Sequence, residues 1–251
     1  MKLCFTGLSD PGLVRSVNQD AYYIDPEGRF FILADGMGGH AGGEEASRIA
    51  TKEISAHLVA NWDSPQSSEE LLSSALLQAN KAIVQDQHDF PERSDMGTTA
   101  VVVIFRAPEQ PWCAHIGDSR LYCLRDSDLQ QITEDHTWVA RAIKVGEIKP
   151  EEARTHPWRH VLSRCLGRDD LYQVEVQKLN VQAGDRLLLC SDGLTEELVD
   201  HTITDCFQPS LVVQKPMEAQ IQSVAISLVE AAKEHGGHDN ITVVIVVLEA
   251  L

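Results

Sequence analysis

Five aspartates stand where apolar, strand-like runs begin or end, and these carboxylates are the residues best placed to do chemistry in this sequence. They are Asp20, Asp35, Asp118, Asp192 and Asp239. Turn chemistry alone favours aspartate beside glycine, so any one of them taken singly is explained as a turn residue. All five together indicate a site, because the ends of core strands converge on one edge of a sandwich.

Carboxylate and backbone carbonyl oxygens are hard donors that suit Mg²⁺ or Mn²⁺. Five glycines fall in the eight residues 36–43. Gly36, directly after Asp35, permits a tight turn that lets a carbonyl also reach a cation. A site for a softer metal requires a cluster of cysteines and histidines, and the sequence predicts none. We therefore expect a magnesium or manganese site.

Composition narrows the class of protein. The chain has 251 residues with 21 basic and 38 acidic side chains, a formal net charge of −17, which disfavours binding to nucleic acid. Most of the acids are expected to form a solvated surface. No apolar run approaches the ~20 residues of a membrane span. The first residues lack the apolar core of a signal peptide, so we expect a cytoplasmic protein. Six scattered cysteines without a Cys-x-x-Cys pair are expected to be buried free thiols.

The elements that must position the aspartates can be read from the apolar pattern. Strand-like runs occupy 29–35, 99–105, 112–118, 120–124, 185–193 and 241–248, and Asp20 opens a further expected strand. Helical spacing of apolar residues is found in 44–59, 69–85 and 218–233. Strands and helices do not alternate regularly, which argues against a doubly wound parallel sheet. The pattern predicts an α+β fold of antiparallel sheets with helices packed outside.

Seven segments, taken in order, resemble the motifs of a known family. They are "RSVNQD", "ADGMGGHAGGEEAS", "MGTTA", "IGDSRLY", "ITEDHT", "CSDGLTE" and "GGHDNITVV". They resemble the metal-dependent serine/threonine protein phosphatases of type 2C, in their compact bacterial form. The resemblance runs from Gly7 to Leu248, and so implies a single catalytic domain over residues 1–251. The implied fold is a four-layer α-β-β-α sandwich of two antiparallel sheets with a small flap.

The resemblance implies a metal centre with two core ions, Mg²⁺ or Mn²⁺. Asp35 bridges both ions and the carbonyl of Gly36 binds one of them, while Asp192 and Asp239 hold the first. A water shared by the two ions then attacks the phosphorus of phosphoserine or phosphothreonine directly, without a phosphoenzyme.

Two further aspartates take outer positions in the implied centre. Asp20 acts on a metal through a water. Asp118 holds a third, more labile ion, with the turn residue as the alternative interpretation.

Two other residues carry implied catalytic roles. Arg15 clamps the phosphate with its guanidinium fork, the alternative being an ordinary surface arginine. His40 protonates the departing serine or threonine oxygen, the alternative being that it hydrogen-bonds a metal water or caps a helix. Asn240 and His136 are expected to support the site, and residues 96–99 to pack beneath it.

Residues 138–167 correspond to the family's flap and are basic in an acidic chain. The segment holds six arginines and lysines against three glutamates, a net charge of +3. Two short amphipathic helices, broken near Pro150 and Pro157, are expected in it. Such a surface, including His160, would receive an approaching phosphoprotein. The alternatives are that the charges merely solvate the helices and that His160 packs under the flap.

Within the family, the sequence most resembles the cyanobacterial phosphatase that acts on the phosphorylated PII signal protein. A PII-like signal protein is therefore the first candidate substrate, and we expect a monomer in signal transduction with no nucleic-acid or membrane partner. Two other functions stay open: a phosphoprotein-binding module with weak or no catalysis, and a hydrolase of small phosphoesters.

Overall fold

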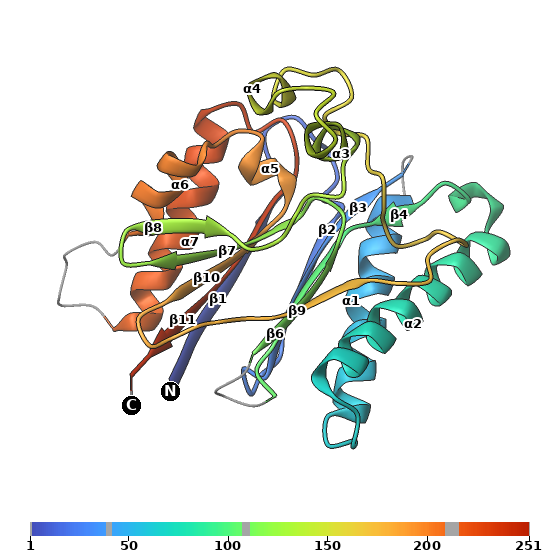
Figure 1. Cartoon of the computed structure of the whole chain (residues 1–251), viewed down its shortest axis with the longest axis horizontal. Helices are drawn as coiled ribbons and strands as arrows, with labels where there is room; N and C mark the ends of the chain where they lie inside the picture. The colour runs from blue at the N-terminus through green and yellow to red at the C-terminus, as the bar shows by residue number, and fades with distance from the viewer. Residues whose placement is uncertain (1, 39–41, 107–110, 209–215, 251) are drawn as a thin grey trace.

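Two antiparallel sheets packed face to face form the centre of the molecule (Figure 1). The computed structural model describes residues 2–38, 42–106, 111–208 and 216–250. The first sheet has the order β1 (Lys2–Asp10), β11 (Ile241–Glu249), β10 (Arg186–Cys190), β7 (Arg120–Arg125) and β8 (Asp128–Gln131). The second has the order β2 (Asp20–Ile24), β3 (Phe30–Met37), β5 (Ala100–Ile104), β6 (Trp112–Ile116) and β9 (Glu175–Lys178), and β4 (Gly97–Thr98) pairs with the end of β3.

Helices cover the outer face of each sheet. The second sheet is covered by α1 (Gly42–Asn61) and α2 (Ser68–Asp89), with a short 3-10 turn at Pro91–Arg93 following α2. The first sheet is covered by α5 (Asp192–Thr195), α6 (Asp200–Phe207) and α7 (Met217–Glu234). The result is the predicted four-layer α-β-β-α sandwich, and the α+β fold class is confirmed.

The apolar runs are continuous because both faces of the central strands are covered. All eight residues from Ile241 to Leu248 in β11 are buried. Alternate residues of the strands belong to different cores: Val244 and Val246 lie between the two sheets, whereas Val243 and Ile245 lie under α7. Burial of this kind supplies most of the stability of a sandwich.

The flap lies at one end of the sandwich, at the top of Figure 1. It contains α3 (Trp138–Lys144) and α4 (Pro150–Ala153), so the two expected short helices are present and Pro150 begins the second. Isolated bridges Thr137–Leu162 and Thr98–Leu166 tie the segment to the body of the domain. The flap is therefore held beside the end of β3.

Two sequence predictions on the chain as a whole can be compared with the structure. None of the helices in the described ranges has the length and apolarity needed to cross a lipid bilayer. The six cysteines are free thiols, five of them buried and Cys206 partly buried, as predicted.

Candidate active site

The predicted site residues meet at one cavity of about 730 Å³ at the flap end of the sandwich. Its lining includes Arg15, Asp35, Gly36, Asp118, Asp192, Asp239 and His160. The strand-end aspartates therefore converge as the sequence predicts. Asp20 is not among the lining residues, and His40 lies outside the described residues.

The backbone of Asp35 is fixed by two threonines of "MGTTA". The Asp35 N–H donates to Thr99 Oγ1 at 2.9 Å, and the Asp35 carbonyl accepts from Thr98 Oγ1 at 2.8 Å and from the Thr99 N–H at 2.9 Å. The side-chain carboxylate takes no part in these bonds. The sequence analysis predicted packing for residues 96–99 and missed this orienting role, for which the paired threonines were the available signal.

Gly36 explains part of the glycine-rich stretch. Its N–H donates to the carbonyl of Gln19 at 3.1 Å. A Cβ at this position would lie 2.0 Å from the carbonyl oxygen of Gly43 and 2.6 Å from that of Gln19. Only glycine therefore allows the start of α1 to pass this close to the end of β3.

Asp20 lies next to Asp35, on the neighbouring strand. The two are direct partners in the β2–β3 register. Ser191 Oγ donates to Asp20 Oδ2 at 2.8 Å, while Asp20 Oδ1 is buried without a hydrogen-bond partner among the described residues. An unpartnered buried carboxylate oxygen is costly unless an ion or water meets it. The position agrees with the predicted role of acting through a water.

Asn240 joins three segments around the site. Its Oδ1 accepts from the Gln19 N–H at 2.8 Å, and its Nδ2 donates to the carbonyls of Pro11 and Val17, both at 3.0 Å. These bonds hold the loop that carries Arg15 against the start of β11. Asn240 thus has the support role that the sequence predicts.

Arg15 reaches the carboxylate cluster directly. Its Nη2 lies 2.7 Å from Asp239 Oδ2, and the two side chains are 53% and 38% exposed. The guanidinium therefore faces the cavity and is not an isolated surface charge. The ion pair itself was not foreseen from the sequence.

The buried carboxylates repel one another. Burial, followed by the charge of Asp20, raises the pKa of Asp35 well above its ordinary value. Burial, followed by the charge of Asp192, does the same to the pKa of Asp118. Burial raises the pKa of Asp20 to about 7 and, with the charge of Asp239, that of Asp192 to about 6. Within the described residues, the only ion pair to any of these five carboxyl groups is that of Arg15 with Asp239, so the donor set fits divalent cations with oxygen ligands.

Protein stripped of divalent cations is expected to lose stability as the pH rises from about 4 to about 7. The folded-state pKa values of Asp20 and Asp192, about 7 and about 6, lie above the ordinary value of 3.8. The folded state therefore binds more protons than the unfolded chain in this window, and deprotonation favours unfolding. Asp25, whose pKa is lowered by Arg29, contributes in the opposite direction only below about pH 4.

The measurement is Tm in EDTA at about pH 5 and about pH 7.5, repeated with Mn²⁺. We expect the lower Tm at the higher pH, and a rise on adding Mn²⁺ there. A Tm in EDTA that increases with pH would show that the cluster does not carry this repulsion.

The basic side chains of the flap partly turn toward the body of the domain. Arg159 Nε lies 3.2 Å from Glu196 Oε2, His160 Nδ1 lies 3.6 Å from Glu196 Oε1, and Arg154 donates to the carbonyl of Thr195 at 3.1 Å. His160 is 49% exposed, so it is not packed under the flap. Two further flap cations pair with glutamates outside it, Lys144 with Glu134 and Arg164 with Glu175. The basic surface is therefore smaller than the sequence alone indicates.

Comparison with known proteins agrees with this geometry. Residues 14–228 match the family model described as "Protein phosphatase 2C". Serine/threonine protein phosphatase PstP of Mycobacterium tuberculosis (strain H37Rv) is 39% identical over 246 residues, which cover 97% of this chain and 44% of that protein. The chain thus spans less than half the length of PstP. Protein phosphatase PhpP of Streptococcus pneumoniae (strain R6) is 35% identical over 243 residues, 95% of each chain.

Solved structures show the same similarity. The crystal structure of the serine/threonine phosphatase PstP/Ppp of Mycobacterium tuberculosis superposes with a TM-score of 0.86 at 38% identity, covering 99% of both chains. The catalytic domain of PstP in complex with two manganese ions gives a TM-score of 0.83 at 36% identity, again over 99% of both chains. None of these relatives is described as acting on a PII signal protein.

Proposed function

This chain belongs to the protein phosphatase 2C family of serine/threonine protein phosphatases, and from that premise we propose that it hydrolyses phosphoserine and phosphothreonine in proteins. The observation that carries the proposal is the convergence of four aspartates on one cavity beside an arginine, with a fifth, Asp20, close enough to Asp35 for their charges to interact. The names of the relatives and the two manganese ions of one of them support it.

In the proposed centre, Asp35 and the carbonyl of Gly36 would hold the cations, together with Asp192 and Asp239. Two bound divalent cations supply a polarised water and neutralise charge on the phosphoryl oxygens. The protein must hold its own ligand oxygens in place. At the end of β3, the hydrogen bonds of Thr98 and Thr99 fix the backbone of Asp35 and so position its carboxylate. Asp118, which also lines a neighbouring pocket with flap residues such as Val139 and Ala153, is proposed for a third ion, and Asp20 for a contact through water.

Direct attack of water is supported by what lines the cavity. Among its described lining residues there is no cysteine or serine, and the one hydroxyl, that of Thr99, is bonded to the Asp35 N–H and to Ser119 Oγ at 2.7 Å. A phosphoenzyme on a serine, threonine or cysteine side chain therefore has no free nucleophile among the described lining residues. His40 remains the proposed proton donor to the leaving oxygen, on its sequence position alone.

Arg15 is proposed to bind the phosphate of the substrate. In the structure it neutralises Asp239, and a cation on Asp239 would take over that role and leave the guanidinium fork for an anion. Arg15→Ala is expected to raise KM for a phosphothreonine peptide by roughly 10-fold or more, with a smaller fall in kcat. Arg15→Lys, which keeps the charge without the fork, should recover only part of the loss. An unchanged KM in Arg15→Ala would show that Arg15 is an ordinary surface arginine that does not bind the phosphate.

The flap is proposed to contact protein substrates, because its residues Arg154, Arg159 and His160 line the cavity. His160→Ala should slow turnover of an intact phosphoprotein while p-nitrophenyl phosphate is hydrolysed at nearly the same rate. His201→Ala, an exposed histidine of α6, is the matched control. Proportional loss on both substrates would make the flap a support for the metal centre. A phosphorylated PII-like signal protein is the first protein substrate to try, on likeness alone.

The proposed activity is tested by phosphate release from matched phosphoserine, phosphothreonine and phosphotyrosine peptides in Mn²⁺, Mg²⁺ and EDTA. We expect release from the first two peptides only when a divalent cation is present. Hydrolysis of p-nitrophenyl phosphate without either peptide would favour a small-phosphoester hydrolase. Tight binding of phosphopeptides with no turnover in Mn²⁺ would favour a binding module.

A further inference from the structure

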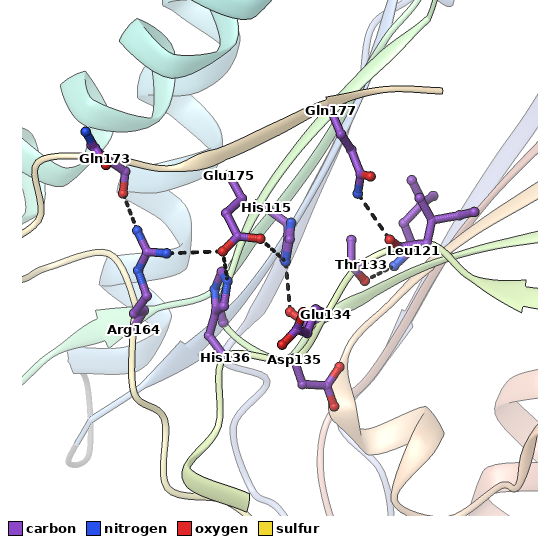
Figure 2. Close-up of polar contacts among 12 residues, drawn as sticks. His115, Leu121, Thr133, Glu134, Asp135, His136, Arg164, Gln173, Glu175 and Gln177 are labelled. Atoms are coloured by element: carbon purple, nitrogen blue, oxygen red, sulfur yellow. Dashed lines mark hydrogen bonds and ion pairs between the residues drawn. The ribbon is translucent and has the colours of Figure 1, made fainter. Parts of the chain in front are cut away.

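Two histidines and a glutamate form a separate cluster away from the carboxylate cavity. His115 is in β6, His136 follows Asp135 in the loop after β8, and Glu175 opens β9. Figure 2 shows the Glu175 carboxylate directed at both imidazole rings. One potential ligand atom from each residue lies within 4.8 Å of the other two. The sequence analysis was wrong to expect no such cluster, because residues far apart in the chain meet through the β6–β9 register, in which His115 faces Glu175.

The distances suit a small cation. His136 Nε2 lies 3.1 Å from Glu175 Oε1, and His115 Nε2 lies 4.0 Å from Glu175 Oε2. Ligand atoms bound to a tetrahedral Zn²⁺ at ~2.0–2.1 Å are roughly 3.3–3.5 Å apart. The two measured distances bracket that value but run to different oxygens of Glu175, so the carboxylate must turn to bring one oxygen to both imidazoles.

His136 directs its Nε2 at the Glu175 carboxylate, 3.1 Å from Oε1. The residue is 8% exposed, its Nδ1 accepts from the Gly117 N–H at 3.1 Å, and its Nε2 is buried without a hydrogen bond among the described residues. Burial, with the nearby His115, also lowers the pKa of His136 and so favours its neutral form. Because Nδ1 accepts a hydrogen bond, the neutral ring carries its proton on Nε2. A cation on Nε2 therefore requires this proton to move to Nδ1, with loss of the bond from the Gly117 N–H.

His115 can take part at a modest cost. It is 2% exposed, and its Nε2 lies 2.9 Å from the Glu134 carbonyl, while its Nδ1 is buried with no partner in the described part of the chain. Moving the ring proton to Nδ1 would leave Nε2 free to bind a cation. The carbonyl oxygen of Glu134 then becomes a candidate fourth ligand, beside the two imidazoles and the carboxylate.

An open cavity gives a cation access to the cluster, and Arg164 competes with the cation for Glu175. A cavity of about 780 Å³ opens beside the cluster and is lined by His115, Glu134 and Glu175, with Glu69 and Glu70 of α2. Glu175 is half-exposed, and Arg164 Nη1 lies 3.3 Å from its Oε1. An incoming cation must share Glu175 with Arg164, and Oε2 is the oxygen that faces His115.

We propose that His115, His136 and Glu175 form a second metal site, for a transition-metal cation of the Zn²⁺ class. Two imidazoles and one carboxylate are the ligand set that such ions favour, whereas Mg²⁺ prefers oxygen ligands alone. The site is separate from the carboxylate centre and does not depend on the phosphatase proposal.

The position of His136 gives the site a route to Asp118. The His136 N–H donates to the Gly117 carbonyl at 2.9 Å, and its Nδ1 accepts from the Gly117 N–H. Gly117, with φ of 100°, is thus bonded on both sides by one residue, and Asp118 follows it. A cation on Nε2 would place the ring proton on Nδ1, which could then no longer accept from the Gly117 N–H, so cation binding would alter the turn that carries Asp118.

The test is Zn²⁺ binding by equilibrium dialysis against protein kept in excess Mg²⁺, which occupies oxygen-ligand sites. We expect one Zn²⁺ per chain, bound at least 10-fold more weakly by Glu175→Gln and by His115→Asn. His201→Asn, an exposed histidine elsewhere, should bind like the unchanged protein. Asp35→Asn should also keep the Zn²⁺ site, which separates this result from failure of the phosphatase proposal.

Co²⁺ provides a second readout that does not depend on activity. Four-coordinate Co²⁺ with nitrogen ligands absorbs visible light more strongly than octahedral Co²⁺ bound by oxygens. We expect the stronger absorption in the unchanged protein and in Asp35→Asn, and its loss in Glu175→Gln. No Zn²⁺ uptake in excess Mg²⁺, or equal affinity in Glu175→Gln and His115→Asn, would overturn the proposal.

Discussion

Asp35→Asn is expected to lower the rate of phosphopeptide hydrolysis by about 10³-fold or more, the largest effect of any single change considered for this chain. Asp35 stands at the centre of the cluster, since the charges of Asp20, Asp192, Asp118 and Asp239 all act on it. Removing its charge removes the proposed contact to both cations while leaving the backbone bonds from Thr98 and Thr99 intact.

The same substitution should stabilise the protein when no divalent cation is present. Burial and repulsion raise the pKa of Asp35 well above its ordinary value, so its ionised form costs stability near neutral pH. Asp35→Asn should therefore raise Tm in EDTA at about pH 7.5 and reduce the further rise on adding Mn²⁺.

Asp25→Asn is the matched control for Asp35→Asn. Asp25 directly follows β2, at the end opposite Asp20, and is buried. Its carboxylate pairs with Arg29 at 2.8 Å, and hydrogen bonds from Arg29 lower its pKa although burial opposes this. Its substitution should lower Tm and leave activity in Mn²⁺ unchanged. If Asp35→Asn instead lowers Tm in EDTA as Asp25→Asn does, the repulsion assigned to the cluster is absent.

Gly36→Ala is expected to have the second-largest effect, on folding as well as on activity. The new methyl group would lie 2.0 Å from the Gly43 carbonyl oxygen and 2.6 Å from that of Gln19, and both contacts are with backbone. To remove these clashes, the start of α1 or the backbone at Gln19, just before β2, must move. We therefore expect a loss of about 1–3 kcal/mol or more in the free energy of unfolding. Displacement of Asp35 should lower kcat by at least about 10-fold in the molecules that still fold.

Gly146→Ala is the control for a glycine substitution without crowding. No atom lies within 4 Å of a Cβ at this flap position, and only its positive φ of 79° opposes alanine. A loss of about 1 kcal/mol with activity retained is expected. The measurements are denaturant unfolding and kcat of Gly36→Ala and Gly146→Ala. Equal losses in the free energy of unfolding would contradict the steric argument for Gly36.

The local pattern of the sequence was enough for the strands and helices that carry the site. The six apolar runs correspond to β3, β5, β6, β7, β10 and β11, and the three helical patterns to α1, α2 and α7. Shorter or more polar elements were missed, as in β9, where only Val176 among its four residues is apolar. The nine-residue β1 was missed as well, and only Cys4 in it is buried. Sequence patterns report the elements that bury a continuous face, and these are the ones that hold the aspartates.

Contacts set by register between strands were not predictable in the same way. The bond of Ser191 to Asp20 joins residues 171 positions apart, and His115 meets Glu175 only through the pairing of β6 with β9. The ion pair of Arg15 with Asp239 also depends on two loops from opposite ends of the chain. No local periodicity encodes such contacts, so they appear only once the sheets are assembled.

The central claim is that hydrolysis requires divalent cations held by the aspartate cluster. The measurement is the rate of phosphate release from a phosphothreonine peptide as Mn²⁺ is added to protein freed of metal. The account predicts no turnover before addition, and a rate that appears with Mn²⁺ in the unchanged protein but not in Asp35→Asn. Full turnover by the metal-free protein, or equal Mn²⁺-dependent rates in Asp35→Asn, would contradict it.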